Sequence, residues 1–182
     1  MAYRTNKRKI INDPVYGFIN IPGDLIFDLI ENPWFQRLRN IRQLGLTSFV
    51  YPGANHSRFQ HCLGAMHLME MAISTLRSKG TYISPEEEEA VFCAILLHDS
   101  GHGPFSHALE NSIISGITHE DLSLLLMKEL NERFGGRLEL AIEIFKGNYK
   151  RRFLHDLIAG QIDMDRLDYL RRDSFFTGVI EG

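Results

Sequence analysis

Residues 90–107 read Ala90-Val91-Phe92-Cys93-Ala94-Ile95-Leu96-Leu97-His98-Asp99-Ser100-Gly101-His102-Gly103-Pro104-Phe105-Ser106-His107. The run is apolar as far as Leu97, which is typical of a buried helix, and the glycines that follow end it. An unpaired imidazole and carboxylate at the buried end of a helix would be costly, so His98 and Asp99 need a compensating charge. A divalent cation supplies one, and the alternative is a helix end capped by histidine. The glycines also allow the backbone to bring His102 and His107 back over the site.

Capping signals predict where this helix begins. Ser84 and Glu87 have the spacing of a capping box, and Pro85 suits the first helical position. Glutamate occupies every position from Glu86 to Glu89. We interpret these glutamates as a solvated first turn, which the helix dipole favours, in preference to a metal or partner site.

The remaining patterns are mainly helical. Apolar spacing, capping residues and terminal glycines predict helices over residues 34–44, 58–76, 118–134, 138–145 and 153–172. Residues 10–25 mix β-forming residues with turn punctuation, which fits a short hairpin. The sequence therefore predicts an all-α helical bundle with a short N-terminal β-hairpin.

The bulk composition fits one domain, residues 1–182. The chain is 44% hydrophobic and has a net charge of −3, which gives no general attraction to nucleic acid or membranes. Its apolar runs are too short to cross a bilayer, and its polar, basic first residues do not resemble a secretory signal. Cys62 and Cys93 lie in apolar stretches without metal-type spacing, and they fit core positions in a reducing compartment. We therefore expect a cytoplasmic protein.

A histidine–aspartate pair alone is weak evidence for a site. The pair occurs a second time at His155-Asp156, in a polar stretch beside Arg151 and Arg152, where we expect a surface position. The apolar helix before His98-Asp99 and the histidines after it distinguish the first pair from the second.

Residues 98–107 resemble the central signature of the HD-domain phosphohydrolases, and more narrowly that of the dGTPase-like deoxynucleoside triphosphate triphosphohydrolases. Three further blocks resemble the family in the same order: residues 43–64, which include Tyr51-Pro52-Gly53-Ala54 and His56-Ser57-Arg58-Phe59-Gln60-His61, then His119-Glu120, then residues 163–178. The resemblance covers essentially the whole chain. Because family members are typically longer, it implies that this sequence is the N-terminal portion and lacks the family's C-terminal region.

The resemblance implies four metal ligands. These are His61, His98, Asp99 and Asp165. Asp163 competes for the fourth position, but the family places that ligand directly before a basic residue, as Arg166 follows Asp165. Residues two apart on a helix cannot face one ion equally, so the two aspartates are true alternatives.

Two imidazoles and two carboxylates suit Mn, Fe, Zn, Ni, Co or Mg better than Ca. We expect one such ion, and a second Mg²⁺ accompanying the substrate. The sequence does not choose among these metals.

Further roles come from the resemblance. The implied catalytic groups are His119, Glu110, His102 and His107, where His119 and Glu110 match the family's catalytic histidine and acid. His102 would contact the α-phosphate and His107 would protonate the leaving oxygen, and each could instead only orient its neighbours. Thr118 would place His119 in a first helical turn, where the dipole disfavours imidazolium. The implied substrate-binding residues are Gln43, Leu44, Arg58, Arg166, Tyr169 and Asp173, with Gln43 and Asp173 reading the sugar 3′-hydroxyl.

The leading hypothesis is hydrolysis of a dNTP at the α-phosphate to a deoxynucleoside and triphosphate. One alternative is an HD nucleotidase or phosphodiesterase with another substrate. Another is a non-catalytic module that binds nucleic acid or protein through Arg37, Arg39 and Arg42, although we expect these arginines to form a salt-bridged amphipathic helix. We expect the full-length protein to be a homo-oligomer without a membrane partner.

Overall fold

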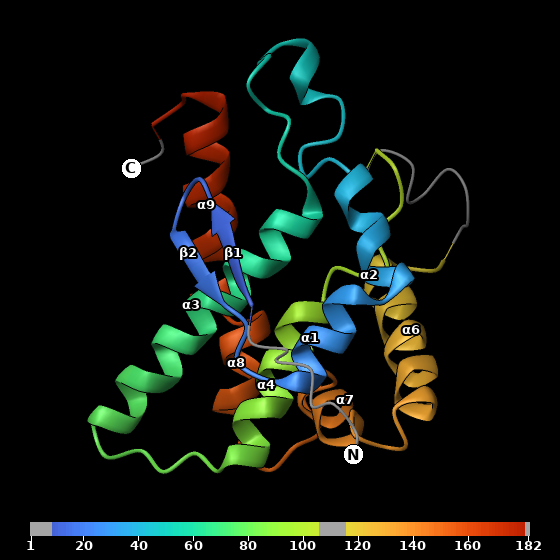
Figure 1. Ribbon diagram of the computed structural model, residues 1–182, viewed down its shortest axis with the longest axis vertical. Coiled ribbons are helices and arrows are strands. Elements are labelled where there is room, and N and C mark those ends of the chain that lie inside the picture. The colour runs from blue at the N-terminus through green and yellow to red at the C-terminus, as the bar shows by residue number, and fades with distance from the viewer. Residues whose placement is uncertain (1–8, 106–115, 181–182) are drawn as a thin grey trace, which may run out of the picture.

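The computed structural model describes residues 9–105 and 116–180, and helices dominate it (Figure 1). In chain order the elements are β1 Ile10–Asp13, β2 Gly17–Asn20, α1 Asp24–Glu31, α2 Pro33–Gln36, the 3₁₀ helices η1 Arg37–Asn40 and η2 Thr47–Phe49, α3 Arg58–Ser78, α4 Pro85–Leu97, α6 His119–Arg133, α7 Glu139–Phe145, α8 Phe153–Ala159 and α9 Met164–Thr177. The prediction of an all-α fold with a short hairpin is confirmed. Within the described residues, no helix is both long and apolar enough to cross a membrane.

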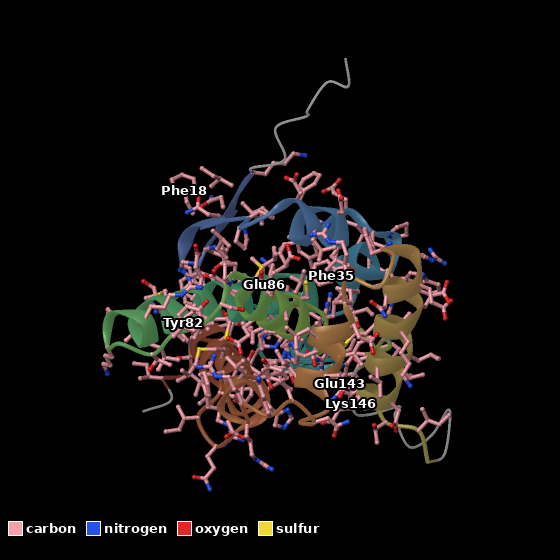
Figure 2. All side chains as sticks on the ribbon, turned by 90° about the horizontal axis from the view of Figure 1, so that it is seen from below. Phe18, Phe35, Tyr82, Glu86, Glu143 and Lys146 are labelled. Carbon is pink, nitrogen blue, oxygen red and sulfur yellow. The ribbon has the colours of Figure 1, made fainter. Side chains whose placement is uncertain are left out.

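The hairpin is antiparallel, with Ile10 opposite Asn20 and Asp13 opposite Gly17. The carboxylate of Asp13 closes the turn by accepting hydrogen bonds from the backbone N–H groups of Val15 and Tyr16 at 2.9 and 3.1 Å. The outer face of the hairpin is exposed to solvent. Phe18 on this face projects away from the molecule, whereas Phe35 on α2 lies in the interior (Figure 2). Asp13 itself is buried.

Helix α4 is the centre of the fold because it is apolar on all sides from Ala90 to Leu97. Its residues from Ala90 to Leu97 are all buried, and it packs against α3 and α7. Ser84 caps it as predicted, by accepting a hydrogen bond from the N–H of Glu87 at 3.2 Å. The free thiols Cys62 and Cys93 are both buried in this core, as the sequence indicated. Helix α4 therefore delivers its C-terminal residues, His98 and Asp99, into the protein interior.

The helix predicted over residues 34–44 is wrong. Regular structure shortens to α2 and η1, and Ile41 is extended. The backbone there pairs with the segment before α3, through the N–H of Gln43 to the carbonyl of His56 at 3.0 Å and a bridge between Arg42 and Ser57. This pairing with a distant segment replaces the hydrogen bonds that a helix would form at residues 41–44. Sequence reasoning also missed α1, although the buried positions of that helix follow helical spacing.

The expected basic helix face does not form. Arg37 donates to the carbonyl oxygens of Ser100 and His102, Arg39 bonds the Gln36 side chain and stacks over Phe59, and Arg42 bonds the Ser48 hydroxyl. Among the described residues these three arginines contact amide, carbonyl and hydroxyl oxygens, so the prediction of a salt-bridged helix is wrong.

The helix predicted over residues 153–172 is two helices. α8 ends at Ala159, and α9 restarts after Asp163, whose carboxylate accepts a hydrogen bond from the N–H of Arg166 at 2.7 Å. This N-cap reorients the chain between the two helices. α9 then ends at Gly178, whose φ of 74° is the left-handed conformation that glycine adopts without strain.

The second histidine–aspartate pair is structural. Asp156 is exposed, and Nδ1 of the half-buried His155 lies 3.0 Å from the carbonyl oxygen of Ile144. The surface prediction therefore holds for Asp156 and only partly for His155.

Glu87 is buried, so the expectation of a fully solvated glutamate turn is wrong at this residue. Its carboxylate accepts hydrogen bonds from the N–H of Ser84, the hydroxyl of Tyr149 and the guanidinium of Arg151. It thereby joins the start of α4 to the segment that precedes α8. The buried charge is compensated by three donors, which makes it a stabilising contact.

Stability should depend on the charge of Glu87. Burial by itself would raise the pKa of this carboxyl, but its hydrogen bonds to Ser84, Tyr149 and Arg151 outweigh burial and hold the pKa below the ordinary value of 4.5. A lowered folded-state pKa gives stability that is present above the unfolded-state pKa and is lost as pH falls through the folded-state value. We expect Glu87→Gln to reduce the free energy of unfolding by about 1 to 2 kcal/mol at neutral pH, and the difference from wild type to shrink in acid.

Urea unfolding at neutral pH and at about pH 3 measures this effect. Glu132→Gln is the matched control, because Glu132 is an exposed glutamate on α6. A difference between Glu87→Gln and wild type that stays constant over this range would contradict the prediction.

Candidate metal centre

Three helices bring the four proposed ligands together. His61 comes from the first turns of α3, His98 and Asp99 from the end of α4, and Asp165 from the first turn of α9. His61 Nε2 lies 3.0 Å from Asp165 Oδ1 and 3.6 Å from Asp99 Oδ2. His98 Nε2 lies 3.5 Å from Asp165 Oδ1 and 3.5 Å from Asp99 Oδ1. Nitrogen and oxygen atoms thus converge on one point from three elements.

The donor atoms suit a cation. His61, His98 and Asp99 each offer an atom within 4.8 Å of the other two, and the Nε2 atoms of both histidines are buried without a well-formed hydrogen bond to a described residue. A buried polar atom left in this way is costly. Imidazole nitrogens and carboxylate oxygens in such a cluster can hold a divalent metal ion, so the residues fit the ion that the sequence suggested.

The other ring nitrogens of the two histidines are held in place. Asp168 Oδ2 lies 2.7 Å from His61 Nδ1, and the carbonyl oxygen of Ile95 lies 2.6 Å from His98 Nδ1. Both oxygens only accept, so each Nδ1 carries a proton. Burial by itself would lower the pKa of both histidines, but neighbouring carboxylates outweigh it and raise the pKa of His61 to about 10 and that of His98 above its ordinary value. Each Nε2 therefore also holds a proton until a metal ion displaces it. With the ion bound, each ring would be the Nδ1–H form. This is the tautomer that a metal-binding histidine requires.

The two carboxylates of the cluster are ionised. Burial by itself would raise the pKa of Asp99, but His98, His102 and Arg58 surround it and hold the pKa well below its usual range. The pKa of Asp165 is likewise lowered, because its contacts with His61 and His98 outweigh burial. Two negative charges therefore face the point where the donor atoms converge.

Asp163 and Asp165 have different surroundings. Asp165 contacts both histidines, whereas the carboxylate of Asp163 caps α9 through the N–H of Arg166. The geometry therefore favours Asp165 as the fourth ligand and gives Asp163 a structural task.

Arg58, one of the proposed substrate-binding residues, is buried against the ligand cluster. Its guanidinium contacts Asp99 Oδ2, and the side chain is 4% exposed. Of the other substrate candidates on α9, Arg166 is exposed and Tyr169 is half-buried. Arg58 thus lies inside the proposed metal centre, and Arg166 lies at its rim beside Asp165.

His102 and His119 meet beside the cluster. Their ring centroids are 3.9 Å apart, and His102 Nδ1 lies 3.3 Å from Asp99 Oδ1. Burial outweighs the attraction of Asp99 and lowers the pKa of His102 to about 4, so His102 is neutral near pH 7. Thr118 caps α6 and places His119 in its first turn, as predicted. The candidates His107 and Glu110 lie outside the described residues.

Helix α6 packs closely on the turn after α4 because residue 101 is glycine. A Cβ at Gly101 would collide with the carbonyl of His119 and with the N–H of Ser123. The Ser123 hydroxyl accepts from the N–H of Gly101 at 2.8 Å and donates to the carbonyl of His98 at 2.6 Å. The turn after α4 is thereby fixed on α6.

The structure links Gln43 to Asp173 through His56. The N–H of Gln43 donates to the carbonyl of His56, and His56 Nε2 lies 2.7 Å from Asp173 Oδ1. The His56 ring also stacks on Phe176 at 4.7 Å. Gln43 and Leu44 are half-buried, so the proposed sugar-reading pair and the nucleoside contact occupy one region at the far end of α9.

Sequence reasoning assigned no role to Asp168, Arg172 or His56. Asp168 and Arg172 are fully buried, and both lie on the face of α9 that starts at Asp165. Asp165, Asp168 and Arg172 are spaced by three and four residues, which puts them on one side of a helix. This spacing was the signal in the sequence that could have identified Asp168 and Arg172.

The two aspartates are separable by mutation. We expect Asp165→Ala to abolish tight Mn²⁺ binding because it removes a carboxylate from the cluster. Asp163→Ala should keep Mn²⁺ binding but lower the free energy of unfolding by about 1 kcal/mol, because it removes an N-cap. Isothermal titration with Mn²⁺ and thermal unfolding measure the two effects, and the reverse pattern of metal loss would assign the ligand to Asp163.

Comparison with known proteins agrees with this geometry. A phosphohydrolase of Bacteroides thetaiotaomicron is 62% identical and superposes with a TM-score of 0.94 over 96% of this chain and 44% of its own. The protein YwfO of Bacillus subtilis is 38% identical over 100% of this chain and 44% of its own length. The deoxynucleoside triphosphate triphosphohydrolase SAMHD1 of Homo sapiens is 33% identical over 94% of this chain and 34% of its own length.

The chain thus spans less than half the length of each of these relatives. The profile of the HD domain matches residues 58–173, a range that begins at Arg58 on α3 and includes every proposed ligand. The resemblance seen in the sequence is confirmed, and the chain belongs to the HD domain family.

Proposed function

We propose that the protein is a metal-dependent phosphohydrolase that acts on deoxynucleoside triphosphates. Water would attack the α-phosphorus, the bond to the 5′ oxygen would break, and the products would be a deoxynucleoside and triphosphate. The observation that carries the proposal is the cluster of buried His61, His98 and Asp99 with half-buried Asp165. A separate polar region at Gln43 and Asp173 lies toward the other end of α9. Relatives named as deoxynucleoside triphosphate triphosphohydrolases support the substrate class.

A bound divalent ion at the cluster would polarise a phosphoryl oxygen and lower the pKa of a water molecule. The protein supplies the surroundings. Arg58 balances the charge of Asp99, and neutral His102 can donate a hydrogen bond to a phosphate oxygen. His119, whose ring lies against that of His102, is our candidate for exchanging a proton with the attacking water.

The leaving group also needs a proton. The deoxynucleoside leaves through its 5′ oxygen, and His107 is our candidate for the acid that protonates it, with Glu110 as the accompanying carboxylate. Both residues follow the turn that is fixed on α6 by Gly101 and Ser123. Arg166 and Tyr169, which follow Asp165 on α9, are our candidates for contacts to the outer phosphates, which need cationic and hydroxyl donors.

Sugar recognition would come from the region around His56. The carboxylate of Asp173, held by His56, can accept a hydrogen bond from a 3′-hydroxyl, and the amide of Gln43 can bond the same group. Leu44 offers apolar contact to the nucleoside. Because Asp173 and Asp165 share α9, the distance between sugar contact and metal centre is set by one rigid helix.

The product decides the reaction class. We expect wild type with Mn²⁺ to convert each accepted dNTP to deoxynucleoside and triphosphate, and His98→Ala to abolish turnover because it removes a proposed ligand. Ion-exchange chromatography separates triphosphate from pyrophosphate and orthophosphate. His155→Ala is the matched control, since it removes the histidine of the second pair and should stay active. Pyrophosphate or orthophosphate as the product would refute the proposal.

The 3′-hydroxyl contacts separate this function from a nucleotidase or phosphodiesterase. We expect Asp173→Asn to lower kcat/KM for a dNTP by about 10- to 100-fold, which corresponds to the free energy of one hydrogen bond to a charged group. Wild type should also prefer a dNTP over its 3′-deoxy analogue, and Asp173→Asn should lose that preference. An activity that requires His98 but treats the two substrates alike would favour the nucleotidase or phosphodiesterase instead.

A further inference from the structure

A chain of four buried ionisable side chains runs from the metal centre to the hairpin. His61 Nδ1 lies 2.7 Å from Asp168 Oδ2, Arg172 Nε donates to Asp168 Oδ2 at 2.9 Å, and Arg172 Nη1 donates to Asp13 Oδ2 at 2.8 Å. The side chains of His61, Asp168 and Arg172 are 0% exposed and that of Asp13 is 4% exposed. In Figure 1 the hairpin lies in front of α3 and α9, the two helices that carry His61, Asp168 and Arg172.

Arg172 fixes Asp168 more tightly than a single contact could. Besides the bond from Nε, its Nη2 donates to Asp168 Oδ1 at 2.9 Å. Two parallel bonds from a planar guanidinium set both the position and the plane of a carboxylate. With Asp168 held in this way, the oxygen that accepts the His61 proton has one position, and so does the imidazole ring.

Asp13 in turn fixes Arg172. The guanidinium bonds both oxygens of Asp13, at 2.8 and 3.4 Å, while the same carboxylate also closes the hairpin turn. Asp168 already supplies one carboxylate to the buried guanidinium, and Asp13 supplies a second. The second carboxylate adds orientation, because the fork is then held from both sides.

Gly64 leaves the space that this chain occupies. A Cβ at position 64 on α3 would collide with Asp168 Oδ1 and with Nη2 of Arg172. Both of those groups are pinned by hydrogen bonds and buried, so neither can move away cheaply. The absence of a side chain at residue 64, one turn from His61, therefore allows the carboxylate to reach the histidine.

We propose that Arg172 and Asp13 are positioning residues of the metal centre, which act through Asp168 to keep His61 Nε2 aimed at the bound ion. This inference rests on the metal centre of the proposed function. It gives the β-hairpin a task in metal binding, although within the described residues the hairpin contributes no atom to the ligand cluster. Through this chain, a residue near the start of the sequence affects a histidine on α3.

Cobalt binding tests this series of hydrogen-bonded side chains without any substrate. Co²⁺ reports both affinity and ligand geometry through its visible absorption. Loss of a group that orients a metal-binding histidine typically weakens affinity by about 10- to 100-fold, and we expect this for Asp168→Asn. Arg172→Lys keeps the charge but loses the fork, and Asp13→Asn removes only the far partner, so each should weaken Co²⁺ binding several-fold and shift the spectrum in the same direction.

Gly64→Ala is a steric test that changes no charge. The new methyl group should displace the Asp168–Arg172 pair from His61 and weaken Co²⁺ binding, although alanine favours helix α3 by about 1 kcal/mol. Gly23→Ala is its control, because a Cβ at Gly23 meets no atom within 4 Å. Glu87→Gln is the control for lost stability, since it breaks a buried hydrogen-bonded carboxylate away from the centre and should leave the Co²⁺ affinity unchanged.

The outcomes distinguish this inference from the proposed function. Absent Co²⁺ binding in wild type, or unchanged binding in His98→Ala, would remove the metal centre and both proposals with it. If His98→Ala loses Co²⁺ while folded Arg172→Lys, Asp13→Asn and Gly64→Ala bind it as wild type does, the metal centre stands and the positioning chain is refuted. Asp13→Asn keeps the test decisive if the substitution at Arg172 prevents folding.

Discussion

The buried guanidinium of Arg172 constrains the rest of the structure. A charge in the interior is tolerated only with partners in good geometry, because the cost of desolvation is several kcal/mol for each ion. Arg172 finds those partners on α9 itself, at Asp168, and on the hairpin, at Asp13. The hairpin and α9 can therefore meet in one arrangement only, and Gly64 lets α3 close on them. Apolar contacts alone would permit sliding, whereas this pairing does not.

The same arrangement creates the conditions for metal chemistry. Apolar α4 drives His98 and Asp99 inward, while α3 and α9 carry His61 and Asp165 to the same point. In surroundings of low polarity, charges and dipoles interact more strongly than they do in water. The lowered pKa of both carboxylates follows from this crowding of cationic and polar neighbours. Stability and function thus compete here, because the donor set is costly until a cation completes it.

Helix α9 coordinates the proposed activities. Asp165 faces the ligand cluster, Asp168 and Arg172 continue the same face, and Asp173 turns toward His56 and the segment before α3. The sequence pattern predicted a helix around Gln43. A helical segment there could not pair with the backbone of His56. The observed backbone of this segment pairs with His56 and so links Gln43 through His56 to Asp173. One correction to the predicted secondary structure therefore bears directly on proposed substrate recognition.

The sequence by itself determined the local features. The apolar run before His98-Asp99, the caps at Ser84 and Thr118 and the glycines after Asp99 each act through neighbouring residues. Helix α4, the start of α6 and a metal-type pair at His98-Asp99 could therefore be predicted, whereas His61 and Asp165 came from the family resemblance. The break at Asp163 was a local signal that sequence reasoning missed, because this cap bonds Arg166 only three residues away. The buried state of Glu87 could not be predicted, because its partners Tyr149 and Arg151 lie 62 and 64 residues away. Only the tertiary structure joined Asp13 to Arg172, which are 159 residues apart. Periodicity and capping operate within a few residues, whereas the pairing of distant buried charges depends on how whole helices pack.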